Sequence, residues 1–121
     1  MKRIKIFISS VQSEFAQERE MLCQYIRTDA LLGKFFEPFI FEDVPANEYP
    51  ANHVYLREVE LCDIYLGLFG NLYGYEDIEG VSPTEREYDL AATLHKSRLI
   101  YIKAINENER HPKETALIRK V

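Results

Sequence analysis

The feature that most constrains the fold is an apolar segment that is followed, after a loop, by a strongly signalled helix start. Residues 62–70 form a short and nearly unbroken apolar run, typical of a parallel strand covered by helices on both faces. Ser82, Pro83 and Glu85 are then the residues favoured at the N-cap and at the first and third positions of a helix. The pattern predicts a strand in the middle of a sheet and a helix that begins near Pro83 and continues to about Leu94.

The rest of the chain alternates between the same two kinds of element. Apolar patterning predicts strands over 3–8, 36–41 and 98–103, and helices over 13–27, 53–61 and 112–121. Ser9, Ser10 and Ser13 offer hydroxyls for capping the first helix, and residues 44–52 and 71–80 form polar loops. Such an alternation implies an α/β fold. We expect one domain, a flavodoxin-like three-layer sandwich with a parallel sheet of four to five strands in the order 2-1-3-4(-5).

Composition bounds the partners and the compartment. With 121 residues and a formal charge of -5, the chain has no general electrostatic attraction for DNA or anionic membranes. No segment approaches the length of a membrane span, and the first apolar run is too short for a signal peptide. Cys23 and Cys62 lie far apart without metal-ligand spacing, which indicates reduced thiols. We expect a cytoplasmic protein whose domain binds neither metal, nucleic acid nor membrane.

Glu87 is the candidate catalytic residue. At about 100° per residue it shares an apolar helical arc with Leu90, Ala91 and Leu94, so its carboxylate should face inward. The helix start should lie at the carboxyl edge of the sheet, where open α/β folds bind ligands. An alternative stays open, because an acid near a helix start also complements the helix dipole or accepts hydrogen bonds from a loop.

A ligand crevice is expected between the first and third strands, where residues 9–13 face residues 69–82. One inward carboxylate suits cleavage of an N-glycosidic bond, and nearby hydroxyl or carboxylate groups would hold ribose. Aromatic rings there could stack on a base, or could instead anchor the loop or form a self-association surface. The candidate ligand-binding residues are Ser9, Ser10, Asp43, Phe69 and Tyr73. The sequence contains no phosphate-loop motif and no recognisable histidine triad.

Several segments together resemble a known family. The chain is similar to the TIR-like family of domains of unknown function, of the DUF4062 type, in IFISS (6–10), Glu18-Arg19, Glu42-Asp43, VELCD (59–63), GLFGNLYG (67–74) and SPTEREYDLA (82–91). The resemblance implies a flavodoxin-like TIR fold at the N-terminus of a larger protein with ATPase, NACHT, repeat or helicase-like parts. A RecG-related ATP-dependent DNA helicase is the parent that it favours.

A more distant resemblance concerns Glu87 itself. TIR-domain NAD glycohydrolases and nucleoside deoxyribosyltransferases carry a catalytic glutamate at the start of the equivalent helix, a few residues before a small residue. Glu87 followed by Ala91 matches that position. Residues 83–86 (PTER) stand where many TIR domains have a Trp-Cys pair.

Two functional hypotheses follow. The first is a TIR-like regulatory and protein-interaction module, without a cofactor of its own, that couples a signal or self-association to a C-terminal effector. In that case the parent chain would bind ATP and could act on DNA. The alternative is an NAD or nucleoside N-glycosidic hydrolase that uses Glu87, with Ser9, Ser10 or Asp43 positioning the ribose. Because residues 112–121 lack a helix stop signal, we expect 1–121 to be an N-terminal fragment of a longer protein.

Overall fold

The computed structural model describes residues 2–41, 55–104 and 107–121. Its four strands form one parallel sheet in the order β2-β1-β3-β4, which confirms the expected topology. The strands are β1 (Ile4–Ser10), β2 (Phe36–Phe39), β3 (Ile64–Phe69) and β4 (Ser97–Ile102). The helices are α1 (Gln12–Thr28), α2 (Leu32–Phe35), α3 (Leu56–Leu61), α4 (Pro83–Thr93) and α5 (Pro112–Lys120).

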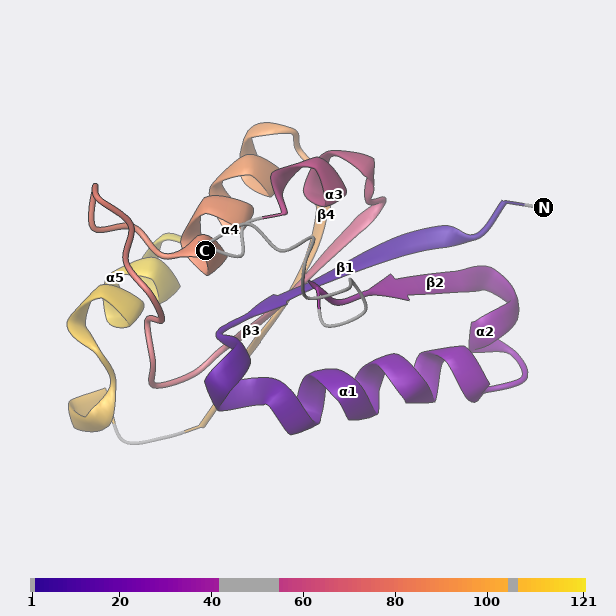
Figure 1. The fold of residues 1–121 in the computed structure, drawn as a ribbon, viewed down its shortest axis with the longest axis horizontal. Coiled ribbons are helices and arrows are strands. Elements are labelled where there is room, and N and C mark those ends of the chain that lie inside the picture. Colours follow the sequence, from indigo (N-terminus) through magenta and orange to yellow (C-terminus); the bar gives the residue numbers. More distant parts are fainter. Residues whose placement is uncertain (1, 42–54, 105–106) are drawn as a thin grey trace.

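Helices cover both faces of the sheet, as the apolar run in β3 predicted. Figure 1 shows α1 and α2 on one side and α3 and α4 on the other. Successive side chains of a strand point to opposite faces, so Leu66 joins the cluster under α1, whereas Tyr65 and Phe69 join the cluster under α4. Leu117 brings α5 into the second cluster. The result is the flavodoxin-like three-layer sandwich expected from the sequence.

The start of α4 is the local prediction that the structure confirms most directly. Ser82 is the N-cap, its hydroxyl accepts a hydrogen bond from the Glu85 N–H at 3.2 Å, and Pro83 is the first helical residue. The reciprocal bond of a capping box is replaced, because the Ser82 N–H donates to the Tyr73 hydroxyl instead. That hydroxyl donates in turn to Glu85 at 2.6 Å, so Tyr73 links the two ends of the cap.

The start of α1 differs from the prediction. The serines do not cap the helix, because β1 continues through Ser9 and Ser10, and Val11 is an N-cap that gives no side-chain hydrogen bond. Ser9 and Ser10 are buried polar residues whose hydroxyls have partners elsewhere in the fold, as described below. A strand can therefore continue through residues that the sequence pattern treats as a polar turn.

Smaller differences concern element ends. β2 ends at Phe39, two residues earlier than predicted, and the short α2 was not predicted. The predicted helix over 53–61 is observed from Leu56, and the predicted loop over 44–52 lies outside the described residues. Leu94 lies just after α4 and is exposed, because the inward face of that helix consists of Thr84, Glu87, Tyr88 and Ala91.

Candidate functional site

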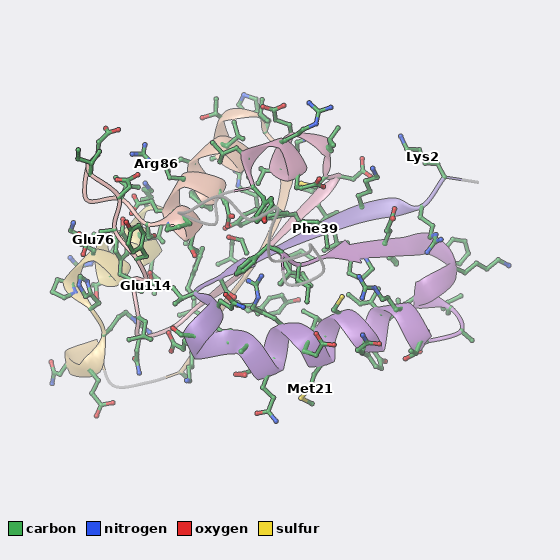
Figure 2. The ribbon with its side chains drawn as sticks, viewed as in Figure 1. Lys2, Met21, Phe39, Glu76, Arg86 and Glu114 are labelled. Carbon is green, nitrogen blue, oxygen red and sulfur yellow. The ribbon has the colours of Figure 1, made fainter. Side chains whose placement is uncertain are left out.

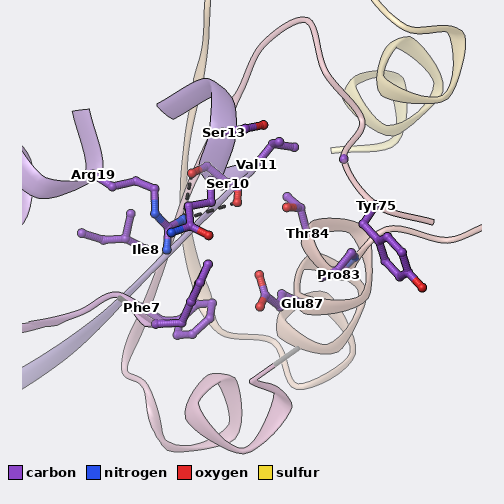
Figure 3. A pocket seen from close by; sticks show the side chains of 13 residues that line it. Phe7, Ile8, Ser10, Val11, Ser13, Arg19, Tyr75, Pro83, Thr84 and Glu87 are labelled. Atoms are coloured by element: carbon purple, nitrogen blue, oxygen red, sulfur yellow. Dashed lines mark hydrogen bonds between the residues drawn. The ribbon is translucent and has the colours of Figure 1, made fainter. Parts of the chain in front are cut away.

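A cavity of about 230 Å³ lies at the carboxyl end of β1, between the first turns of α1 and α4. This is the switch point of the strand order, where open α/β sheets bind ligands. Figure 3 shows Arg19 and Ser10 on one side of the cavity and Glu87 and Thr84 on the other. The lining residues are Phe7, Ile8, Ser10, Val11, Gln12, Ser13, Arg19, Phe41, Gly74, Tyr75, Pro83, Thr84 and Glu87.

Glu87 contributes a buried carboxyl group to the cavity wall. It is only 5% exposed, because it lies between Thr84 and Ala91 on the inward face of α4. The Ser9 hydroxyl donates to its Oε1 atom at 2.8 Å, and the backbone N–H of Tyr55 also donates to the carboxyl group. Burial raises the pKa of Glu87 to about 7, although both hydrogen bonds and the charge of Arg19 oppose the rise. The carboxyl group can therefore give or take a proton near neutral pH.

Arg19 is the main site residue that the sequence analysis did not assign. It is 1% exposed, and its Nη1 atom donates to the Ser10 hydroxyl at 2.8 Å, with a longer contact of 3.4 Å to the Ser10 carbonyl. Its guanidinium lies over the Phe41 ring, 5.0 Å from the centroid. A signal was present, since Arg19 follows Phe15 by four residues and precedes Cys23 by four, within the apolar stripe of α1.

The predicted ligand-binding residues are only partly brought together. Ser9 contacts Glu87, Ser10 lines the cavity, and Asp43 lies outside the described residues. Phe69 is fully buried in the core, where it packs edge-on against Tyr88, and it does not line the cavity. The aromatic residue of the β3–α4 loop that does line the cavity is Tyr75, which belongs to the rings considered for stacking on a base but not to the predicted ligand-binding residues.

Tyr73 is also placed away from the cavity. It is buried, it joins Ser82 to Glu85 through its hydroxyl, and its ring stacks on His111 with 5.7 Å between centroids. These contacts fix the β3–α4 loop to the starts of α4 and α5. Tyr73 thus has the loop-anchoring contacts that the sequence analysis considered as an alternative.

A second buried acid, Glu114 on α5, holds the same loop at a different place. Its Oε2 atom accepts from the Gly70 N–H at 3.3 Å, and the carboxylate of Glu14 accepts from the N–H groups of Asn71 and Leu72 at 2.8 Å each. We call Glu14 and Glu114 the loop clamp. Burial, with a further contribution from Glu14, raises the pKa of Glu114 to about 7. Figure 2 shows Glu114 near α5 and the β3–α4 loop, and the residue does not line the cavity.

In the parts of the chain that the structure describes, no three His, Cys, Asp or Glu side chains come together as metal ligands. No helix in those same parts is long and apolar enough to cross a membrane. Cys23 and Cys62 are buried cysteines that form no disulfide within the described residues.

The sheet order, the two helical layers and the cavity at the switch point define a flavodoxin-like α/β domain. A family model described as a domain of unknown function (DUF4062) matches residues 5–120. The chain therefore belongs to the DUF4062 family, which confirms the resemblance to a family of domains of unknown function. No curated protein matches the chain.

Proposed function

We propose that the cavity binds a nucleoside or nucleotide and that Glu87 acts on its N-glycosidic bond. The observation that carries the proposal is the position of the Glu87 carboxyl group, buried at the cavity wall and hydrogen-bonded to Ser9. A fixed carboxylate beside an anomeric carbon stabilises the positive charge that develops when the base leaves. Phe7, Phe41 and Tyr75 line the same cavity and offer flat apolar surfaces for a base.

The reaction is a hydrolysis in which the bond between ribose C1′ and the base nitrogen breaks. The base leaves with the bonding electron pair, and the ionised Glu87 carboxylate either stabilises the resulting cation or bonds to C1′ as an ester. Water then supplies hydroxide to C1′; where an ester has formed, this step breaks the bond between C1′ and the Glu87 oxygen and restores the carboxylate. The remaining proton of the water ends on the departing base, or in solution when the base leaves as neutral nicotinamide. Because the carboxylate must be ionised, the rate should rise as the pH passes through about 7.

The size of the cavity favours a small ligand. At about 230 Å³, the part bounded by described residues is smaller than the roughly 300–1,000 Å³ usual for drug-sized ligands. A single nucleoside suits this space better than a whole NAD molecule. NAD stays in the proposal as a ligand that would place only its reacting half in the cavity.

The test incubates the protein with a panel of nucleosides, nucleoside monophosphates and NAD, and measures the free base that is released by chromatography. Glu87→Gln keeps the size of the side chain but removes the ionisable carboxyl group, so we expect a loss of roughly 10³-fold in rate. Glu114→Gln is the matched control, because it changes another buried acid outside the cavity. Equal activity of Glu87→Gln and wild type, or release of no base from any compound, would overturn the proposal.

A second candidate is the TIR-like regulatory module, in a cytoplasmic parent protein with a RecG-related ATP-dependent helicase part. One specific observation favours it: the edge strand β4 exposes Leu99, Tyr101 and Ile102 at 45%, 57% and 48%. Exposed apolar edge strands are suited to contacts with other chains. Light scattering over a concentration series tests self-association, which Tyr101→Lys should weaken. A domain that releases no base and self-associates through β4 would support the module over the enzyme.

A further inference from the structure

We infer that the Tyr75 ring closes over the mouth of the cavity and stacks on the base of the bound nucleoside. The inference rests on the proposed function, since it takes Glu87 to be the group beside the glycosidic carbon. It adds a separate site for the base and the residue that recognises it. The group that this site takes is a flat heteroaromatic ring, held by its face.

Burial separates the mouth of the cavity from its interior. Glu87 and Thr84 are buried, and so are Phe7 and Phe41. The lining residues that are exposed or half-buried form what we call the mouth: Gln12, Ser13, Gly74, Tyr75 and Pro83. A ligand whose reacting carbon lies beside Glu87 therefore has its outer end at the mouth.

Two of the three aromatic residues that line the cavity leave little ring surface to a ligand. Phe7 is 3% exposed, and the rings of Phe39 and Tyr65, from the strands on either side of β1, both stack on it. Phe41 is 9% exposed, and the Arg19 guanidinium lies over its ring. Both phenylalanines therefore pack mainly against other protein groups and form an apolar wall.

Tyr75 is the aromatic residue whose ring is available. It is 69% exposed, and within the described part of the chain its side chain has no hydrogen bond, ion pair or ring contact. Figure 3 shows the ring turned outward, away from Glu87. An exposed side chain changes rotamer within nanoseconds, so the ring can turn over the mouth without breaking a hydrogen bond. Stacking on a base would bury a large apolar surface that the free protein leaves in water.

The backbone that carries Tyr75 is fixed on both sides. Two residues before it, the Tyr73 hydroxyl donates to Glu85 of α4 at 2.6 Å. Two residues after it, Asp77 accepts hydrogen bonds from the Arg86 guanidinium, also on α4, at 2.9 and 3.0 Å. These contacts hold the loop against the helix that carries Glu87. Only the side chain of Tyr75 has to move, which keeps the ordering cost of binding small.

A base at the mouth is in the position that the reaction requires. Glu87 acts on C1′ from the interior, so the ribose lies deeper and the base, which is the leaving group, lies on the solvent side. Stacking recognises the face of a base and not the donors and acceptors along its edge. We therefore expect the site to accept purine and pyrimidine bases, and to bind purines more tightly because their faces are larger.

Binding of formycin A tests the inference without turnover. Its purine-like base is joined to ribose through carbon, so the compound has no N-glycosidic bond. Calorimetric titration of the 121-residue chain compares its affinity with that of ribose, which has no base. We expect formycin A to bind at least about tenfold more tightly than ribose.

Substitutions of Tyr75 then show whether the ring face is responsible. Tyr75→Ala should bind formycin A about tenfold more weakly, whereas Tyr75→Phe keeps the ring and should stay within about twofold of the wild type. Because the residue is exposed, both variants should remain folded, which circular dichroism checks. Tyr25→Ala is the matched control, since Tyr25 is 60% exposed on α1 and does not line the cavity. It should change the affinity less than about twofold.

The outcomes separate the inference from the proposed function. Equal affinity of the wild type and Tyr75→Ala for formycin A, no binding at millimolar concentration, or equal losses in Tyr75→Phe and Tyr75→Ala would overturn the inference. If formycin A binds as expected but no nucleoside releases its base, the stacking site stands and the hydrolase does not. If nucleosides are hydrolysed with the same kcat/KM by the wild type and Tyr75→Ala, the hydrolase stands and the stacking site does not.

Discussion

Two glutamates are buried in the described part of the chain, Glu87 and Glu114; both carboxyl groups have a pKa of about 7, and their surroundings give them different roles. Glu87 lines a cavity, where a hydroxyl group holds it and Arg19 lies on the facing side. Glu114 is 1% exposed, lies outside that cavity and accepts a hydrogen bond from the backbone of Gly70. A raised pKa therefore reports burial, and only the neighbouring cavity distinguishes a candidate site from a structural contact.

The largest effect that can sharpen this comparison is the pH dependence of stability. An acid whose pKa rises from 4.5 to about 7 on folding binds its proton more tightly in the folded state. Its contribution to stability is complete below pH 4.5 and is lost as the pH rises through 7, at a cost of roughly 3 kcal/mol for each acid. Glutamine does not ionise, so the Glu87→Gln and Glu114→Gln variants should each avoid the loss of stability that the replaced acid causes at high pH.

Urea unfolding at pH 5 and pH 8 measures this effect. Each variant should have nearly wild-type stability at pH 5 and exceed the wild type at pH 8. The two variants should then differ in activity, since only Glu87→Gln is expected to lose it. A Glu87→Gln variant with the same pH dependence as the wild type would mean that water reaches this carboxyl group and keeps its pKa ordinary.

The same two acids show how far the sequence predicts the site. Glu87 could be predicted because a strong helix start fixes its place in the first turns of α4, and helical periodicity then fixes its face. Glu114 could not, because its burial depends on the path of the β3–α4 loop, and its partner Gly70 is 44 residues away in the chain. Periodicity reports which face of an element is inward, and it does not report which distant loop covers that face.

Other features of the molecule also divide into those that the sequence predicts and those that it does not. The strand order followed from the alternation of elements, a property of the whole chain. The positions of Phe69 and Tyr73 could not be predicted in this way, because an aromatic residue beside a crevice can either line the crevice or pack behind it. Here both residues pack behind the cavity. Arg19 was visible as a charge within an apolar stripe, but its contact with Ser10 required β1 to extend two residues beyond its predicted end.

Gly70→Ala is a smaller perturbation that tests the loop clamp. A Cβ atom at this position would lie 2.3 Å from the Glu14 Oε2 atom, so the flexible carboxylate must turn away. Glu14 would then lose its hydrogen bonds to the N–H groups of Asn71 and Leu72, and we expect a loss of about 2 kcal/mol in the free energy of unfolding. In a Glu14→Ala background the same change should cost less than about 0.5 kcal/mol, because the obstructing carboxylate is absent. Equal costs in both backgrounds would assign the effect to the backbone of Gly70 and not to the clamp.

The smallest effect is expected from Lys103→Met, and it separates the two kinds of contact that Glu14 makes. The Lys103 Nζ atom lies 3.5 Å from the Glu14 Oε2 atom, but this lysine side chain is 44% exposed, so water and salt weaken the ion pair. The backbone N–H groups approach the same carboxylate to 2.8 Å from the loop that it holds. We therefore expect a loss of less than about 0.5 kcal/mol, measured by urea unfolding at low salt and again at high salt. A loss as large as that of Gly70→Ala, abolished by salt, would contradict this expectation. It would show that the ion pair with Lys103, and not the backbone contact, is what allows Glu14 to hold the loop.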